Sequence, residues 1–291
     1  MATLLDFRRR IRSVKNTQQI TRAMKFVAAA RLRRAQEAAL AARPYARELV
    51  RVLRSTMARI ESPQHPLLAH RPEERILLLL LSGERGLAGA FNSNILKKAS
   101  EFYRGKAGKQ VTAIPIGKKG RDALRKAGIT FADEYVNVLS RVDFGIAREI
   151  SKLVMDLYTE EKVDAVYAVF SEFKSVLSAD LVVEKVLPVE KITAHEETEN
   201  EAASSQVDYI YEQPEDVLMA RLLPRYVETQ VLRAMLESCA AEHAARMTAM
   251  EAATKNAGEV IEGLTLHMNK VRQAAITKEI IEIVSGASST A

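Results

Sequence analysis

The sequence predicts an α/β domain inserted between two long terminal helices that form an antiparallel coiled coil. Three observations support this fold class. Glycine (12) and proline (8) are scarce for 291 residues, which favours long helices. An apolar seam with helical spacing runs along each end of the chain, and strand-like and helical segments alternate between the seams. We expect three segments, at residues 1–60, 61–207 and 208–291.

The first seam begins at Leu4 and continues in alternating steps of three and four residues to Ile60. Thirteen of its 17 positions are apolar, a heptad pattern typical of a coiled coil. The polar exceptions are Gln18, Thr21, Lys25 and Thr56. We expect Lys25 and Gln18 to turn out of the seam toward a surrounding partner, and Pro44 to kink or interrupt the helix.

The second seam runs from Leu236 to Ala275, and only His243 and Thr254 are polar in it. If both helices meet the middle of the chain at one place, they run antiparallel. At 1.5 Å per residue the second helix would be about 105 Å long and the first about 90 Å. The end of the second helix, "RQAAITKEIIEIVSG" (272–286), would then project beyond the first, although it is strongly apolar.

The middle of the chain predicts a compact α/β domain with a largely parallel sheet, because strands and helices alternate. The predicted strands are 75–83, 110–117, 163–173 and 181–189. The predicted helices are 89–104, 118–128 and 142–161. The acidic segment 195–206 is interpreted as a loop or linker.

Composition and charge limit the possible functions. The single cysteine, Cys239, excludes an internal disulfide and indicates a reducing compartment. No signal peptide is expected, and the longest apolar run, "ILLLLL" (76–81), is too short to span a bilayer. Residues 1–60 hold 15 basic and 3 acidic residues, which suggests an acidic or polyanionic partner. The alternative is a solvated arginine-rich helix face.

Motifs of catalysis are missing from the sequence. The loop "SGERGLAG" (82–89) lies between a strand and a helix, but its glycines do not follow the G-x-G-x-x-G or P-loop spacing. Simple turn geometry explains it better. The five histidines have no metal-binding spacing, and His243 is interpreted as structural. We therefore expect no catalytic residue, no metal and no cofactor in this chain.

Two other functions stay open at this point. The basic first helix allows a coiled-coil nucleic-acid-binding protein, although aromatic residues are only 5% of the chain. The α/β domain also allows a small-molecule enzyme that oligomerises through its helices. Turnover by the isolated chain, or nucleotide bound at residues 82–89, would favour the enzyme. Steep salt-dependent RNA binding would favour the first alternative.

Several motifs from both ends and the middle resemble the γ subunit family of F-type ATP synthases. They are "NTQQITRAMKFVAAARLRRAQ" (16–36), "RPYA" (43–46), "ERGLAGAFNSN" (84–94), "LPRYVETQV" (223–231), "EHAARMTAMEAATKNA" (242–257) and "NKVRQAAITKEIIEIVSGA" (269–287). The last is the most specific. Two small departures are Glu84, where the family usually has Asp, and Ala88, where many members have Cys.

The resemblance implies a central rotary shaft that couples ion-driven rotation of the c ring to ATP synthesis or hydrolysis on the β subunits. The implied partners are the α and β subunits of the α3β3 hexamer, the ε subunit and the ring of c subunits. The chain itself would be non-catalytic and would bind neither nucleotide nor nucleic acid. Its implied location is the cytoplasmic face of the bacterial plasma membrane, as a peripheral protein.

The resemblance also implies contact residues, for which the alternative is a solvated helix face. Contacts with the hexamer are implied for Met24, Lys25, Arg246, Arg272 and Gln273. Contacts on the side of the c ring and ε are implied for Tyr209 and Glu212. The apolar end, with Ile280, Ile281 and Ile283, would turn inside a sleeve of apolar residues from the hexamer, because apolar contact is non-directional.

Overall fold

The computed structural model describes the backbone of residues 4–57, 65–176, 178–189 and 214–289, and all of their side chains except 215–216 and 286–289. The chain divides into two compact units. The domain unit consists of residues 29–245. The helical unit consists of residues 1–28 together with residues 246–291.

Two long helices contribute residues to both units. They are α1 (Leu4–Met57) and α6 (Glu215–Ser289), and each contains one proline, Pro44 and Pro224 respectively. The predicted interruption at Pro44 does not occur, because α1 continues for more than three turns beyond it. A proline costs a helix one backbone hydrogen bond. Burial of apolar side chains nearby, such as Leu49 and Leu53, offsets that cost.

The domain unit contains a four-stranded sheet with the order β2-β1-β3-β4. The strands are β1 (Arg75–Leu81), β2 (Gln110–Ile116), β3 (Ala165–Phe173) and β4 (Ala179–Leu187). β1 pairs in parallel with β2 and β3, and β4 pairs antiparallel with β3. This arrangement confirms the predicted largely parallel sheet.

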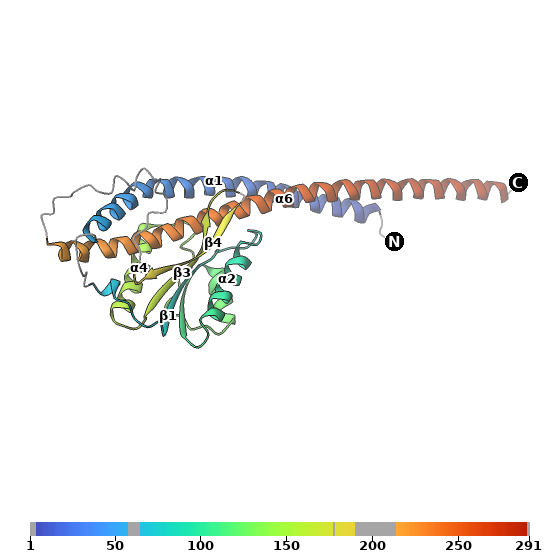
Figure 1. The fold of residues 1–291 in the computed structure, drawn as a ribbon. Helices are drawn as coiled ribbons and strands as arrows, with labels where there is room; N and C mark the ends of the chain where they lie inside the picture. The colour runs from blue at the N-terminus through green and yellow to red at the C-terminus, as the bar shows by residue number, and fades with distance from the viewer. Residues whose placement is uncertain (1–3, 58–64, 177, 190–213, 290–291) are drawn as a thin grey trace. The chain divides into compact units, whose positions relative to one another are not determined.

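Helices cover both faces of the sheet (Figure 1). η1 (Pro66–Leu68) precedes β1, and α2 (Phe91–Gly105), α3 (Lys118–Lys126) and α4 (Phe144–Thr159) lie between the strands in the chain. One apolar cluster joins the sheet to α4, α1 and α6, and a second joins it to α2 and α3. Leu77, Leu79 and Leu81 belong to the first cluster, whereas Leu78 and Leu80 belong to the second. The unbroken apolar run of β1 is therefore explained by burial on both faces.

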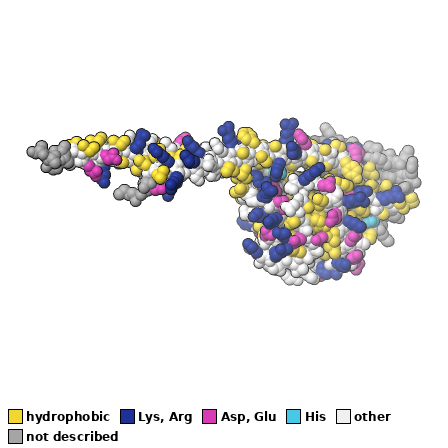
Figure 2. Space-filling view, turned by 180° about the vertical axis from the view of Figure 1, so that it is seen from behind, with side chains coloured by type: hydrophobic (Ala, Val, Ile, Leu, Met, Phe, Trp, Pro, Cys, Tyr) yellow, Lys and Arg dark blue, Asp and Glu magenta, His cyan; other side chains and the backbone are white. Residues whose placement is uncertain are grey.

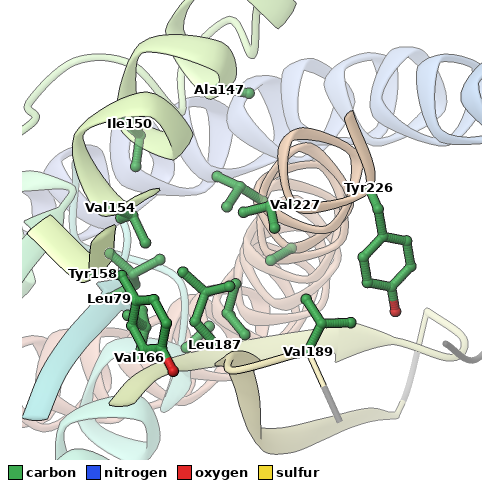
Figure 3. Packing of buried hydrophobic residues seen from close by; sticks show 14 of the residues in the cluster. Leu79, Ala147, Ile150, Val154, Tyr158, Val166, Leu187, Val189, Tyr226 and Val227 are labelled. Atoms are coloured by element: carbon green, nitrogen blue, oxygen red, sulfur yellow. The ribbon is translucent and has the colours of Figure 1, made fainter. Parts of the chain in front are cut away.

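The larger cluster forms the core of the domain unit. Figure 3 shows side chains of α4, the sheet and α6 meeting in it. Ile150 and Val154 come from α4, Leu79 and Val166 from the sheet, and Val227 from α6, and none of them exposes more than 1% of its surface. α6 is therefore an integral part of this core.

In the helical unit the two helices contact each other in opposite chain directions. The ring of Phe7 lies 5.0 Å from that of His267, and Lys25 Nζ lies 2.6 Å from Glu251 Oε1. Gln18 Nε2 donates a hydrogen bond to the backbone oxygen of Thr254 on α6, at 3.3 Å. The prediction that Gln18 turns away from the seam is therefore wrong, whereas Lys25 reaches out of the seam to Glu251, which flanks it. Both find polar partners on α6, which satisfies their polar groups without a second chain.

Glu73 joins three elements at one edge of the domain unit. Its carboxylate accepts hydrogen bonds from Lys106 Nζ at 2.7 Å and from the Tyr167 hydroxyl at 2.8 Å, and Lys185 Nζ lies 3.0 Å away. Burial by itself would raise the pKa of Glu73. The hydrogen bonds from Lys106, Tyr167 and Lys185 outweigh burial and lower the pKa to about 2.

We predict that Glu73→Gln lowers the free energy of unfolding of the full chain by about 2 kcal/mol at pH 7. The pKa of Glu73 is lowered by folding, so its contribution is fully present above pH 4.5 and is lost as the pH falls toward 2. The difference between variant and wild type should therefore shrink to about half or less at pH 3 in urea unfolding experiments. Glu101→Gln, at an exposed carboxylate, is the control. An equal Glu73→Gln effect at both pH values would contradict the prediction.

A second prediction compares two glycines inside α6. A Cβ atom added at Gly263 would meet no atom within 4 Å, whereas one at Gly258 would lie 3.2 Å from Gln18 Nε2. Gly263→Ala should therefore raise the free energy of unfolding by about 1 kcal/mol, the usual gain in a helix interior. Gly258→Ala should gain less, because the Gln18 amide must move. Thermal unfolding followed by circular dichroism distinguishes them, and equal gains would contradict the role of Gln18.

Candidate partner-binding surface

Apolar side chains are exposed at the C-terminal end of α6, where no described element of the chain covers them. The last half-buried residue is Val271, and every residue from 272 to 285 is exposed. Ile280, Ile281 and Ile283 expose 56%, 59% and 71% of their surface. Figure 2 shows hydrophobic side chains interleaved with charged ones along this end of the helix. Several adjacent exposed isoleucines are typical of a surface that another chain covers.

The polar residues of this end are also accessible. Arg272 and Gln273, both implied as contact residues, are exposed. Lys278 and Glu282 form an exposed ion pair along the helix, with 3.6 Å between their charged groups. Such a pair contributes little to stability. The exposed end, defined as residues 272–285, therefore offers apolar contacts together with polar groups at its start.

The remaining implied hexamer contacts lie in the helical unit. Met24, Lys25 and Arg246 are all half-buried. Lys25 is paired with Glu251, a residue that the sequence analysis did not single out. The heptad pattern could have identified Glu251 as a partner for a residue of α1. Glu251 lies three residues before the polar seam residue Thr254 and so flanks the seam. Lys25 is thus partly engaged within its own chain.

Two implied contacts, Tyr209 and Glu212, lie outside the described residues. Across the described ranges, no group of three or more His, Cys, Asp or Glu side chains is arranged to hold a metal ion. The helices that the structure describes include none that is long and apolar enough to cross a membrane.

The loop "SGERGLAG" lies at the carboxyl edge of the sheet, where α/β proteins commonly bind phosphate groups at a helix N-terminus. Here the first backbone donors of α3 are occupied by the chain itself. Lys118 N–H donates to Glu84 Oε2 at 3.1 Å, Lys119 N–H to the Gly83 oxygen at 3.0 Å, and Gly120 N–H to Ser82 Oγ at 2.7 Å. These bonds tie the loop to the start of α3 and occupy donors there. The interpretation of the loop as a simple turn stays a prediction at the start of α2, the helix that follows it.

Two glycines make this closure possible. A Cβ atom at Gly117 would lie 2.0 Å from the carbonyl oxygen of Ser82, and one at Gly120 would lie 2.6 Å from Ser82 Oγ. Gly117 also has a φ of 109°, a backbone conformation that residues with a side chain rarely adopt. The end of β1 thus fills the space above the start of α3.

Leu87, at the tip of the same loop, was not selected from the sequence. It has a φ of 62° and exposes 64% of its surface. A leucine at positive φ is uncommon, and here it turns an apolar side chain outward. The flanking Gly86 and Gly89 are the only signal in the sequence for such a turn.

These observations define a class of protein: a chain that combines an α/β domain with two long helices and acts by contact with other chains. A family model described as ATP synthase matches residues 3–290. The ATP synthase gamma chains of Solibacter usitatus and Desulforamulus reducens are 50% and 48% identical to this chain, and each alignment covers 99% of both proteins. The chain therefore belongs to the ATP synthase γ chain family, whose members are non-catalytic subunits of the complex that synthesises ATP.

Solved structures have the same fold at low sequence identity. One is the rotor of the Euglena gracilis mitochondrial ATP synthase in rotational state 1, with 20% identity and a TM-score of 0.63 over 94% of this chain and 98% of that one. Another is a chain of its OSCP/F1/c-ring assembly in rotational state 3, with 19% identity and a TM-score of 0.67 over 99% and 94%. The family assignment gives no support to the nucleic-acid-binding alternative.

We predict that Ser82→Ala lowers the free energy of unfolding by about 1–3 kcal/mol, because it leaves the Gly120 N–H buried without an acceptor. Ser100→Ala, which removes an exposed hydroxyl that bonds only the Leu96 oxygen of its own helix, should change it by less than about 0.5 kcal/mol. Urea unfolding of the full chain measures both. Equal effects would show that the Ser82 turn is not a structural closure.

Proposed function

We propose that this chain is the central rotary shaft of an F-type ATP synthase. It couples ion-driven rotation of the c ring to conformational change on the catalytic β subunits. Its partners are the α and β subunits of the α3β3 hexamer, the ε subunit and the c ring. Membership in the γ chain family supports this function.

One observation carries the proposal most directly, which is the exposed end of α6. Water is a poor environment for Ile280, Ile281 and Ile283, so this end requires a covering partner. A rotor must be held in place without being held at one angle. Apolar contact meets this requirement because it is non-directional, whereas hydrogen bonds favour particular geometries. The end therefore turns in a sleeve of apolar residues supplied by the hexamer.

The two long helices form an antiparallel coiled coil in this proposal, with segments 1–60 and 208–291 flanking the α/β segment 61–207. The opposite order of the contacts Phe7–His267 and Lys25–Glu251 supports it. The burial of the seam supports it as well, because every position of the first seam among residues 4–57 is buried or half-buried. Met24, Lys25, Arg246, Arg272 and Gln273 face the hexamer from this shaft.

Contacts with the c ring and ε are assigned to Tyr209 and Glu212. The chain belongs to the peripheral part of the complex, at the cytoplasmic face of the bacterial plasma membrane. The excess of basic residues in the first 60 positions suits an acidic surface on β. That contact explains why the positive charge is concentrated on α1.

The proposed mechanism is mechanical. The shaft presents a different face to each β subunit, so each β subunit has a different contact free energy at a given shaft angle. Rotation changes these contacts in turn, and the difference in contact free energy between angles shifts each β subunit between its conformations. In synthesis the ring drives the shaft, and in hydrolysis the order reverses.

We predict that Ile280→Asp/Ile281→Asp/Ile283→Asp, introduced into the whole ATP synthase, lowers ATP synthesis at least about tenfold or prevents assembly, because burying a carboxylate without a partner costs several kcal/mol. Synthesis in inverted membrane vesicles and the subunit ratio of the purified complex are the measurements. Lys278→Ala/Glu282→Ala, which removes the exposed ion pair of the same segment, is the control. Normal synthesis together with normal assembly in the triple variant would rule out the sleeve.

A further inference from the structure

The apolar seam of the helical unit favours pairing of α1 with α6. It does little to determine their register, which is the alignment of the two helices along each other. Along α6 the seam residues Ile261 and Met268 are one heptad apart and similar in size. A slip of the helices by seven residues would therefore exchange one apolar neighbour for another, with little change in buried area. The core of the domain unit anchors other parts of both helices. Within the helical unit, the apolar seam needs a further interaction to distinguish the native register from the slipped one.

Polar groups in the seam supply such an interaction. Thr21 Oγ1 and Thr254 Oγ1 lie 2.8 Å apart, and Gln18 Nε2 donates to the Thr254 backbone oxygen at 3.3 Å. Each hydroxyl also lies within hydrogen-bond distance of a carbonyl of its own helix, at 3.0 Å for Thr21 and 2.7 Å for Thr254. Because each hydroxyl has one proton, one of them donates across the seam and the other donates to its own helix.

We propose that Gln18, Thr21 and Thr254 are positioning residues that fix the register of α1 against α6. A slip of one heptad moves one helix by about 10.5 Å along the other. It places Thr21 opposite Ile261 or Met247 and removes both bonds across the seam. A single polar layer in an apolar seam is a known means of setting register, because only one alignment pairs its polar groups. The Lys25–Glu251 pair adds little, since both side chains are substantially exposed.

The consequence for function rests on the proposed shaft. Lys25 lies on α1 and Arg246 on α6, and both are proposed to face the hexamer. Only one register holds them about one helical turn apart along the shaft. The polar layer therefore sets the contact pattern that each β subunit meets during rotation.

Disulfide trapping in the full-length chain tests the register directly. Heptad counting places Val14 opposite Ile261 in the native register and opposite Met268 after a slip of seven residues. One reporter chain carries Val14→Cys/Ile261→Cys and the other Val14→Cys/Met268→Cys. The native Cys239 is buried in the domain unit and so is a poor competitor. A glutathione redox buffer lets the disulfide yields report the populations of the two registers.

Thr21→Val/Thr254→Val should raise the yield of the slipped pair several-fold relative to the unmodified layer, because the Thr21–Thr254 bond is lost while Gln18 Nε2 still donates to the Thr254 backbone oxygen. Thr21→Ser/Thr254→Ser keeps the hydroxyls and should restore the native yield. The matched control is Thr17→Val/Thr265→Val, whose hydroxyls bond only carbonyls of their own helices. If the valine variant does not fold, Gln18→Leu, which removes the other bond across the seam, should give a rise of similar size. An unchanged yield of the slipped pair in a folded variant would overturn the inference.

The amount of ATP made per ion transported by the assembled complex separates this inference from the proposed function. The valine variant should make several-fold less ATP per ion while it still hydrolyses ATP. A slipped register with normal coupling would leave the role in register intact and overturn its link to rotation.

Discussion

The packing of α6 against the sheet is the interaction on which the rest of the domain unit depends. Leu223, Val227 and Met235 are fully buried between the sheet and the neighbouring helices. One face of β1 and β3 is covered only because α6 lies there together with α4 and α1. The same continuous helix later carries the exposed end, so the chain's core and its partner surface are built from a single element.

The carboxyl edge of the sheet shows how an α/β fold can lack the site that usually defines it. The backbone N–H groups at the start of α3 are the donors that would bind a phosphate in a related architecture. Here Ser82, Gly83 and Glu84 satisfy them, and two glycines allow the close approach. The fold is used as a body that contacts other chains, and the chemistry belongs to other subunits of the complex.

Much of the fold followed from periodicity, because the two seams and the alternating strands are strong patterns. The apolar run of β1 predicted a strand, and the positions of all four strands agree with the prediction within a few residues. The effect of Pro44 was not predictable, since it depends on packing elsewhere along α1. The inward turn of Gln18 was missed because one sequence does not show which polar groups lie opposite it. Leu87 was missed because positive φ at a non-glycine residue depends on the whole loop.

The exposed isoleucines of α6 have a consequence for the life of the subunit before it joins its complex. A newly made copy has an exposed apolar helix end. Other copies and unrelated chains can bind to it through their own apolar surfaces. Cells therefore gain by making this subunit in proportion to those that enclose it, or by degrading the surplus. The same exposed isoleucines make a subunit outside its complex prone to aggregate.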